Sequence, residues 1–150
     1  MPDNAQAGRS VAARRSGYLA ALVVNGALLV LINAAPGWQA VPFLTPATRQ
    51  VLGLVNVVLV LNLVVNVVYL AHDGPWLRAF GDIATTAVGL AVAIRILEVF
   101  PFAFHGSASF WSTVIKILLI LAIVGACIGL LVQVIRLIVL AARGGRSSRR

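Results

Sequence analysis

The chain consists of four long apolar segments separated by short links that contain proline and glycine. The apolar segments cover residues 18–35, 49–71, 82–100 and 110–142. Each is long enough to cross a hydrocarbon core, which takes about 20 helical residues. Strands of a membrane barrel would need only about 9–11 residues and would alternate polar with apolar positions, which these segments do not do. Because backbone groups in lipid must be satisfied within their own segment, the pattern predicts an all-α, four-helix membrane bundle.

The links carry residues that end helices. Pro36-Gly37 follows the first segment, Gly74-Pro75 separates the second from the third, and Pro101 closes the third. Links of roughly ten residues place sequence neighbours antiparallel. We therefore expect one domain over residues 18–142, with residues 1–17 and 143–150 as tails, and Asp82 as the N-cap of the third helix.

The composition supports a membrane protein. Of the 150 residues, 61% are hydrophobic and 11% are charged, whereas soluble domains have about 45–50% apolar and about 25% charged residues. Such a chain has too few charged residues to cover the surface of a soluble domain. It is also too short for a large pocket between two domains.

Most of the net charge of +8 lies in the two tails. Against one acid, Asp3, the tails carry seven arginines: Arg9, Arg14, Arg15, Arg143, Arg146, Arg149 and Arg150. Basic residues are retained on the cytoplasmic side of membranes, and links 36–48 and 101–109 have none. Both termini are therefore expected in the cytoplasm, with the tails attracting anionic lipids rather than nucleic acid.

A cleavable export signal is an alternative interpretation of the N-terminal part. Arg14-Arg15, the apolar stretch that follows and Asn33-Ala34-Ala35 loosely match such a signal. Asn25 interrupts the apolar stretch, however, and no clean small-x-small site follows it. We expect the segment to be retained as the first helix.

Polar residues within the apolar segments are the first candidates for function. The first two predicted helices carry five asparagines: Asn25, Asn33, Asn56, Asn62 and Asn66. Lipid offers no partner for an amide, so these side chains should face other helices. They could line a polar path for an ion or small solute, or they could join the two helices by hydrogen bonds. We favour hydrogen bonding, because no acid lies among them to carry a proton or bind a cation.

Small residues at four-residue spacing are the candidates for helix packing. The third predicted helix has a row of Gly81, Thr85, Gly89 and Ala93, and the fourth has Gly125 and Gly129. Such rows let another helix backbone approach closely. We expect the two rows to pack on each other, with a homodimer through either one as the alternative.

Three charged residues lie near the outer ends of the third and fourth helices. Arg95 and Glu98 are three residues apart and can pair on one helix face. Lys116 lies at a similar depth. A structural ion pair is the favoured interpretation, and a functional site or unpaired anchors at the interface are the alternatives. If the three are paired in a low-dielectric setting, Glu98→Gln should cost roughly 1–3 kcal/mol.

The sequence offers no pattern for catalysis or for metal binding. Cys127 is the only cysteine, and His72 and His105 fall at opposite membrane faces. No paired acids, glycine-rich phosphate loop or nucleophile–base pattern is present. We therefore expect no enzyme, no metal and no cofactor.

One segment of the chain resembles a known group of proteins. It covers residues 81–104, with the sequence GDIATTAVGLAVAIRILEVFPFAF. They resemble small, uncharacterised four-helix membrane proteins of high-GC Gram-positive (actinobacterial) bacteria, whose third helix ends in an aromatic–Pro–Phe–x–Phe motif, here residues 100–104. The resemblance implies an acid at position 103, where this chain has Ala103, and it brings no established activity. Small multidrug-resistance transporters are also four-helix proteins of this length, but they look built around a glutamate in the first helix, where this chain has none.

These observations predict a non-enzymatic, multi-pass protein of the cytoplasmic membrane. An accessory or interaction subunit is the favoured function, with another membrane protein or a second copy as its partner. The alternative is a small transporter or channel with an asparagine-lined path.

Overall fold

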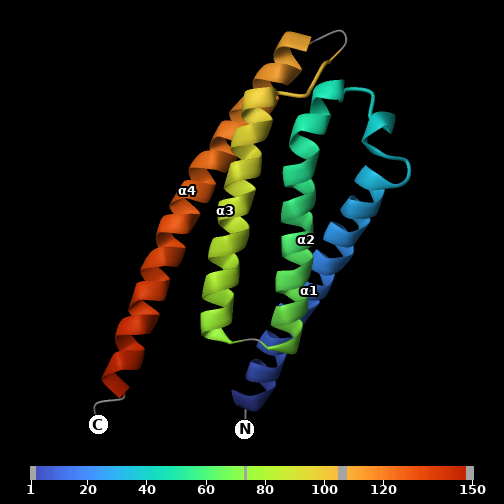
Figure 1. The fold of residues 1–150 in the computed structure, drawn as a ribbon. Coiled ribbons are helices and arrows are strands. Elements are labelled where there is room, and N and C mark those ends of the chain that lie inside the picture. The colour runs from blue at the N-terminus through green and yellow to red at the C-terminus, as the bar shows by residue number, and fades with distance from the viewer. Residues whose placement is uncertain (1–2, 73, 105–107, 148–150) are drawn as a thin grey trace.

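The computed structural model describes residues 3–72, 74–104 and 108–147, and every regular element in them is a helix. Four long helices are joined by short links (Figure 1). The long helices and the two short 3₁₀ helices are α1 (Asp3–Asn33), η1 (Trp38–Ala40), η2 (Pro46–Thr48), α2 (Arg49–Ala71), α3 (Pro75–Val99) and α4 (Ala108–Ser147). All four long helices contain a stretch that is long and apolar enough to cross a membrane: Val11–Asn33, Pro46–Ala71, Pro75–Val99 and Ser109–Ala142.

The helix bounds agree with the sequence prediction for α2 and differ for the others. α1 and α4 continue into the basic tails. In the N-terminal tail, alanine and arginine have high helix propensity. α3 begins at Pro75 with Gly74 as its N-cap, because proline is favoured in the first turn of a helix. Asp82 lies two turns inside α3, so its prediction as the N-cap is wrong.

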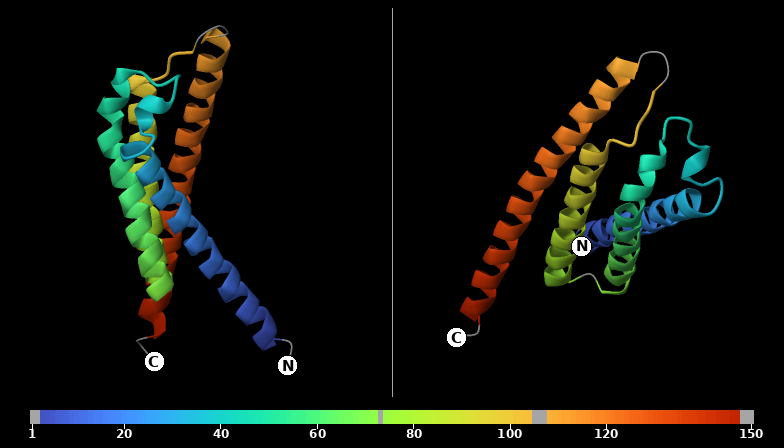
Figure 2. Two further views of the ribbon diagram at one scale, coloured as in Figure 1. Left: turned by 90° about the vertical axis from the view of Figure 1, so that its right-hand side faces the viewer. Right: turned by 45° about the horizontal axis from the view of Figure 1, so that its top comes forward.

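Successive helices run in opposite directions and pack in sequence order, α1 on α2, α2 on α3 and α3 on α4 (Figure 1). In the described part of the chain, α1 and α4 do not pack against each other as the sequence neighbours do. α1 slants away from the other helices (Figure 2, left). The helices thus form an open row in the described part of the chain. Apart from Gly37 in the α1–α2 link, the buried residues of the described part of the chain lie in α2, in α3 or beside them: Thr48, Val51, Leu59, Tyr69, Val92 and Pro101.

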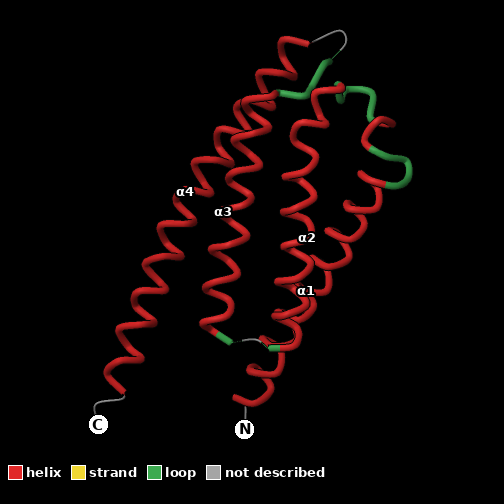
Figure 3. The backbone as a smooth tube through the Cα atoms, viewed as in Figure 1, coloured by secondary structure: helices red, strands yellow, loops and turns green. Residues whose placement is uncertain are grey.

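Both described ends of the chain lie at one end of the molecule, together with the α2–α3 link; we call this the terminal end (Figure 1). The links α1–α2 and α3–α4 lie at the opposite end, which we call the far end (Figure 3). There the two links are joined by backbone hydrogen bonds, from Thr45 N–H to the Pro101 carbonyl at 2.9 Å and from Ala103 N–H to the Phe43 carbonyl at 2.8 Å. This pairing ties the first helix pair to the second.

α2 and α3 are in tight contact at the terminal end, where Gly81 faces Tyr69. A Cβ atom at Gly81 would overlap the Tyr69 hydroxyl and would lie 2.9 Å from its Cζ and 3.0 Å from Val65 Cγ1. The Tyr69 side chain is only 6% exposed, so it has little room to move away. The absence of a side chain at Gly81 therefore sets the distance between the two helices.

We predict that Gly81→Ala destabilises the protein. Overpacking costs about 1–3 kcal/mol, and the better helix propensity of alanine offsets about 1 kcal/mol of this. The expected net loss in the free energy of unfolding is about 1 kcal/mol, measured by unfolding in detergent. Gly89→Ala on the same helix is the control, because its new methyl group would meet no atom within 4 Å. Equal stability of the two variants would contradict the prediction.

Candidate functional site

α1 and α2 are joined by a pair of asparagines towards the far end. Asn33 Nδ2 donates to Asn56 Oδ1 at 2.8 Å, and Asn56 Nδ2 donates to Asn33 Oδ1 at 2.7 Å. The two amides therefore satisfy each other across the helix interface. This is the arrangement expected of asparagines that join helices.

The other three asparagines do not join helices in the described part of the chain. Asn25, Asn62 and Asn66 each donate to the backbone carbonyl four residues earlier in the same helix, at 2.7–2.8 Å. A short polar side chain can satisfy its donor in this way without a neighbouring helix. The expectation that all five amides bond across helices is therefore wrong for these three.

A hollow on the surface of α2 includes one of the asparagines. The surface hollow that includes Asn56 is otherwise lined by aliphatic side chains, Val57, Val60, Leu61 and Val64. An ion moving past these residues would lose its water without gaining polar ligands.

α2 and α3 are joined by Tyr69 at the terminal end. Its hydroxyl lies 2.9 Å from Asp82 Oδ1 and 3.0 Å from the Arg78 carbonyl oxygen, so one proton can be donated to either acceptor. The Tyr69 ring also contacts the Tyr18 ring of α1, with 5.3 Å between centroids. Sequence reasoning missed this bond, because the partners lie on different helices.

α3 and α4 are joined by Gln133, which sequence reasoning also missed. Gln133 Nε2 donates to Thr86 Oγ1 at 3.0 Å, and the Thr86 hydroxyl donates to the Asp82 carbonyl at 2.6 Å. The signal was present in the sequence, since Gln133 is a lone amide in a long apolar run. A neutral polar residue there needs a partner on a neighbouring helix.

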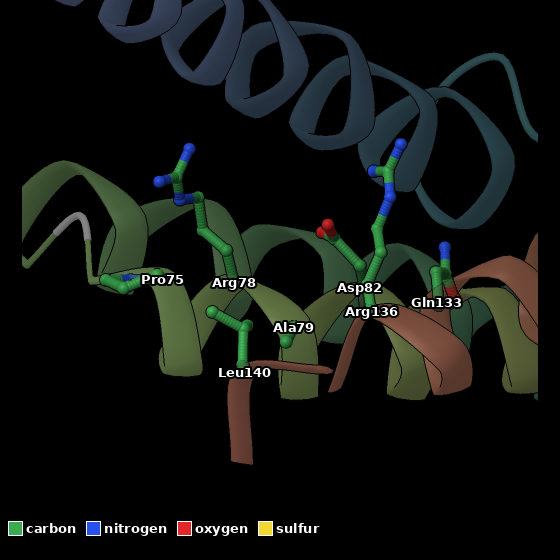
Figure 4. A pocket seen from close by; sticks show the side chains of 7 residues that line it. All are labelled: Pro75, Arg78, Ala79, Asp82, Gln133, Arg136 and Leu140. Carbon is green, nitrogen blue, oxygen red and sulfur yellow. The ribbon is translucent and has the colours of Figure 1, made fainter. Parts of the chain in front are cut away.

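Close to these bonds, α3 and α4 enclose a polar cleft at the terminal end. It has a volume of about 180 Å³ and is lined by Pro75, Arg78, Ala79, Asp82, Gln133, Arg136 and Leu140. The side chains of Arg78, Asp82 and Arg136 extend to the same side of the cleft (Figure 4). Two guanidinium groups and one carboxylate leave the cleft with one net positive charge. We call this the arginine cleft.

The three charged residues at the far end do not form one cluster. Arg95 Nη1 lies 3.0 Å from Glu98 Oε2, and the two side chains are 43% and 57% exposed. Lys116 Nζ instead lies 4.8 Å from the centroid of the Phe100 ring, a cation–π arrangement. The expected ion pair is thus limited to Arg95 and Glu98, and Lys116 is not part of it.

The two rows of small residues do not pack on each other. Added methyl groups at Gly89, Gly125 or Gly129 would meet no atom within 4 Å, and Gly81 faces α2 rather than α4. α3 and α4 meet instead through larger residues such as Thr86 and Gln133. The prediction of a contact between the rows is therefore wrong.

The described residues include no group of three or more His, Cys, Asp or Glu side chains that could hold a metal ion. Cys127 is exposed on α4, and His105 lies outside the described residues. The chain matches no family model, and no curated protein or solved structure is significantly similar to it.

In a membrane, Glu98 would lie at the edge of the hydrocarbon core, because it is the penultimate residue of α3, and this lowers the expected effect of removing the pair. Exposed ion pairs contribute about 0–1 kcal/mol, so Glu98→Gln should reduce the free energy of unfolding by less than about 1 kcal/mol. Unfolding in detergent measures this, with Arg95→Gln as the matched variant for the other charge. A loss of about 3 kcal/mol or more, as for buried pairs, would contradict the prediction.

Proposed function

We propose that this protein is a non-enzymatic subunit of the cytoplasmic membrane that acts by binding another membrane-embedded protein. The proposed orientation has both termini on the cytoplasmic side. It is supported by the described ends of α1 and α4, which share the terminal end with the α2–α3 link, by the arginines of the tails, and by links 36–48 and 101–109, which lack basic residues. Reporter fusions at the two ends test this orientation, and a signal outside the cytoplasm at either end would contradict it.

The observation that carries the proposal is the unpartnered face of α4. This helix has 40 residues and packs substantially against α3 alone. Gly125 and Gly129 have open space above them. In a membrane, helices associate through close packing, and small residues at this spacing let a second backbone approach. The GxxxG face of α4, meaning Gly125 and Gly129, is therefore the proposed binding surface.

The arrangement of polar groups supports binding over transport. Transport would need polar groups that are available to a solute along a continuous path. Here Asn33 and Asn56 satisfy each other, and the other asparagines donate to their own helices. These bonds serve the structure of the protein and leave the α4 face as the candidate for function.

Purification of the tagged full chain in mild detergent tests the proposal. We expect another membrane protein, or a second copy, to co-purify in a stable ratio. Gly125→Leu with Gly129→Leu should abolish this association while leaving the melting temperature unchanged, because both positions have free space.

Gly53→Leu on α2 is the matched control, since Gly53 also has no atom within 4 Å of the added position. It should keep the association. The proposal is wrong if no partner co-purifies, or if the α4 variant retains its partner as well as the control does.

A further inference from the structure

In a membrane, the arginine cleft would lie near the boundary between the hydrocarbon core and the headgroups of the cytoplasmic leaflet. The apolar stretch of α3 has 25 residues and is about 37 Å long, compared with about 30 Å for a hydrocarbon core and about 40–45 Å with the headgroup regions. Measured from Pro75 with the rise per residue of a helix, Arg78 lies about 5 Å along α3 and Asp82 lies about 10 Å along it. With this stretch centred on the core, Arg78 lies at the edge of the core and Asp82 lies about 7 Å inside it. The long arginine side chains can reach the headgroups from this depth.

The side chains beside the cleft agree with this depth. Trp76 and Phe80 stack on each other on α3, with 6.3 Å between ring centroids, and both are exposed. Aromatic side chains of this kind are enriched at the membrane–water interface. The stretch of α4 that spans the membrane has 34 residues, or about 51 Å, so Arg136 does not need to lie deep in the core.

The cleft presents the donors that a phosphate group requires. Each guanidinium carries five N–H donors in a planar fork that matches a phosphate. Arg136 comes from α4 and Arg78 from α3, and both extend to the same side (Figure 4). Asp82 already accepts from Tyr69, and the net positive charge of the cleft favours an anion. The cleft has a volume of about 180 Å³, which is several times the volume of about 30 Å³ that one water molecule takes up in the liquid.

An apolar surface continues from the cleft towards the membrane centre. Val132 and Ile128 lie one and two turns before Arg136 on the same side of α4, and they are 42% and 57% exposed. A free phosphate ion would leave this surface unused. A lipid would place its phosphate on the arginines and its acyl chain along these residues.

We propose that the arginine cleft binds the phosphate of an anionic phospholipid of the cytoplasmic leaflet, with Arg78 and Arg136 as its ligands. The phosphate is held by charge-assisted hydrogen bonds from both helices. The lipid therefore bridges α3 and α4 at the end where Gln133 joins them. This inference requires that the helices span a membrane, but it does not depend on the proposed partner of α4.

Native mass spectrometry of the full chain in detergent, titrated with phosphatidylglycerol, tests the proposal. We expect Arg136→Gln to weaken phosphatidylglycerol binding about tenfold, the effect of losing a charge-assisted hydrogen bond. Arg78→Gln should also weaken the binding of phosphatidylglycerol. Arg49→Gln is the control, because Arg49 is exposed at the start of α2, at the far end, and neither lines the cleft nor belongs to a basic tail. It should change the affinity by no more than about twofold.

Two further ligands distinguish the sources of the phosphate. Phosphatidylcholine, which has no net charge, should bind at least about tenfold more weakly than phosphatidylglycerol, and inorganic phosphate should not displace the lipid at equal concentration. The proposal fails if Arg136→Gln and Arg49→Gln weaken binding equally, or if phosphatidylcholine binds as tightly as phosphatidylglycerol does. Displacement by equimolar inorganic phosphate would identify a site for a free anion and would overturn the lipid assignment.

Discussion

Hydrogen bonds between side chains, one set at each interface, connect the four helices. Asn33 and Asn56 join α1 to α2, Tyr69 joins α2 to α3 through Asp82, and Gln133 joins α3 to α4 through Thr86. In a bilayer, apolar side chains gain little from leaving lipid for another helix, so packing and such polar contacts decide which helices associate. Because each of these bonds joins sequence neighbours and α1 does not pack on α4 in the described part of the chain, the helices form an open row.

This arrangement leaves two surfaces with different chemistry on α4. Its middle, around Gly125 and Gly129, is apolar and open to another helix. Its terminal end, at Gln133 and Arg136, is polar and faces α3 across the arginine cleft. Protein binding and lipid binding would therefore use separate parts of one helix, and a lipid between α3 and α4 would stabilise the helix that presents the binding face.

The sequence predicted the number and type of helices, because apolar length alone determines what can cross a membrane. It also predicted the ion pair between Arg95 and Glu98, because this pair depends only on the spacing of two residues within one helix. It did not predict the bonds of Tyr69 and Gln133, since these depend on how neighbouring helices are rotated and aligned. The same limit explains why the small residues of α3 and α4 were wrongly expected to meet.

The most direct test of this account is a double-mutant cycle across α3 and α4, with Thr86→Val and Gln133→Leu, measured as the free energy of unfolding in mixed detergent micelles. The account predicts a coupling energy of about 0.6 kcal/mol, and at most about 1.7 kcal/mol, the range for hydrogen bonds between membrane helices. Thr85→Val replaces Thr86→Val in the control cycle. The Thr85 hydroxyl bonds within α3, to the Gly81 and Asp82 carbonyls, and it is Thr86 that accepts from Gln133, so Thr85 should show no coupling with Gln133. Equal coupling in the two cycles, or none in either, would contradict the claim that this hydrogen bond holds α4 to α3.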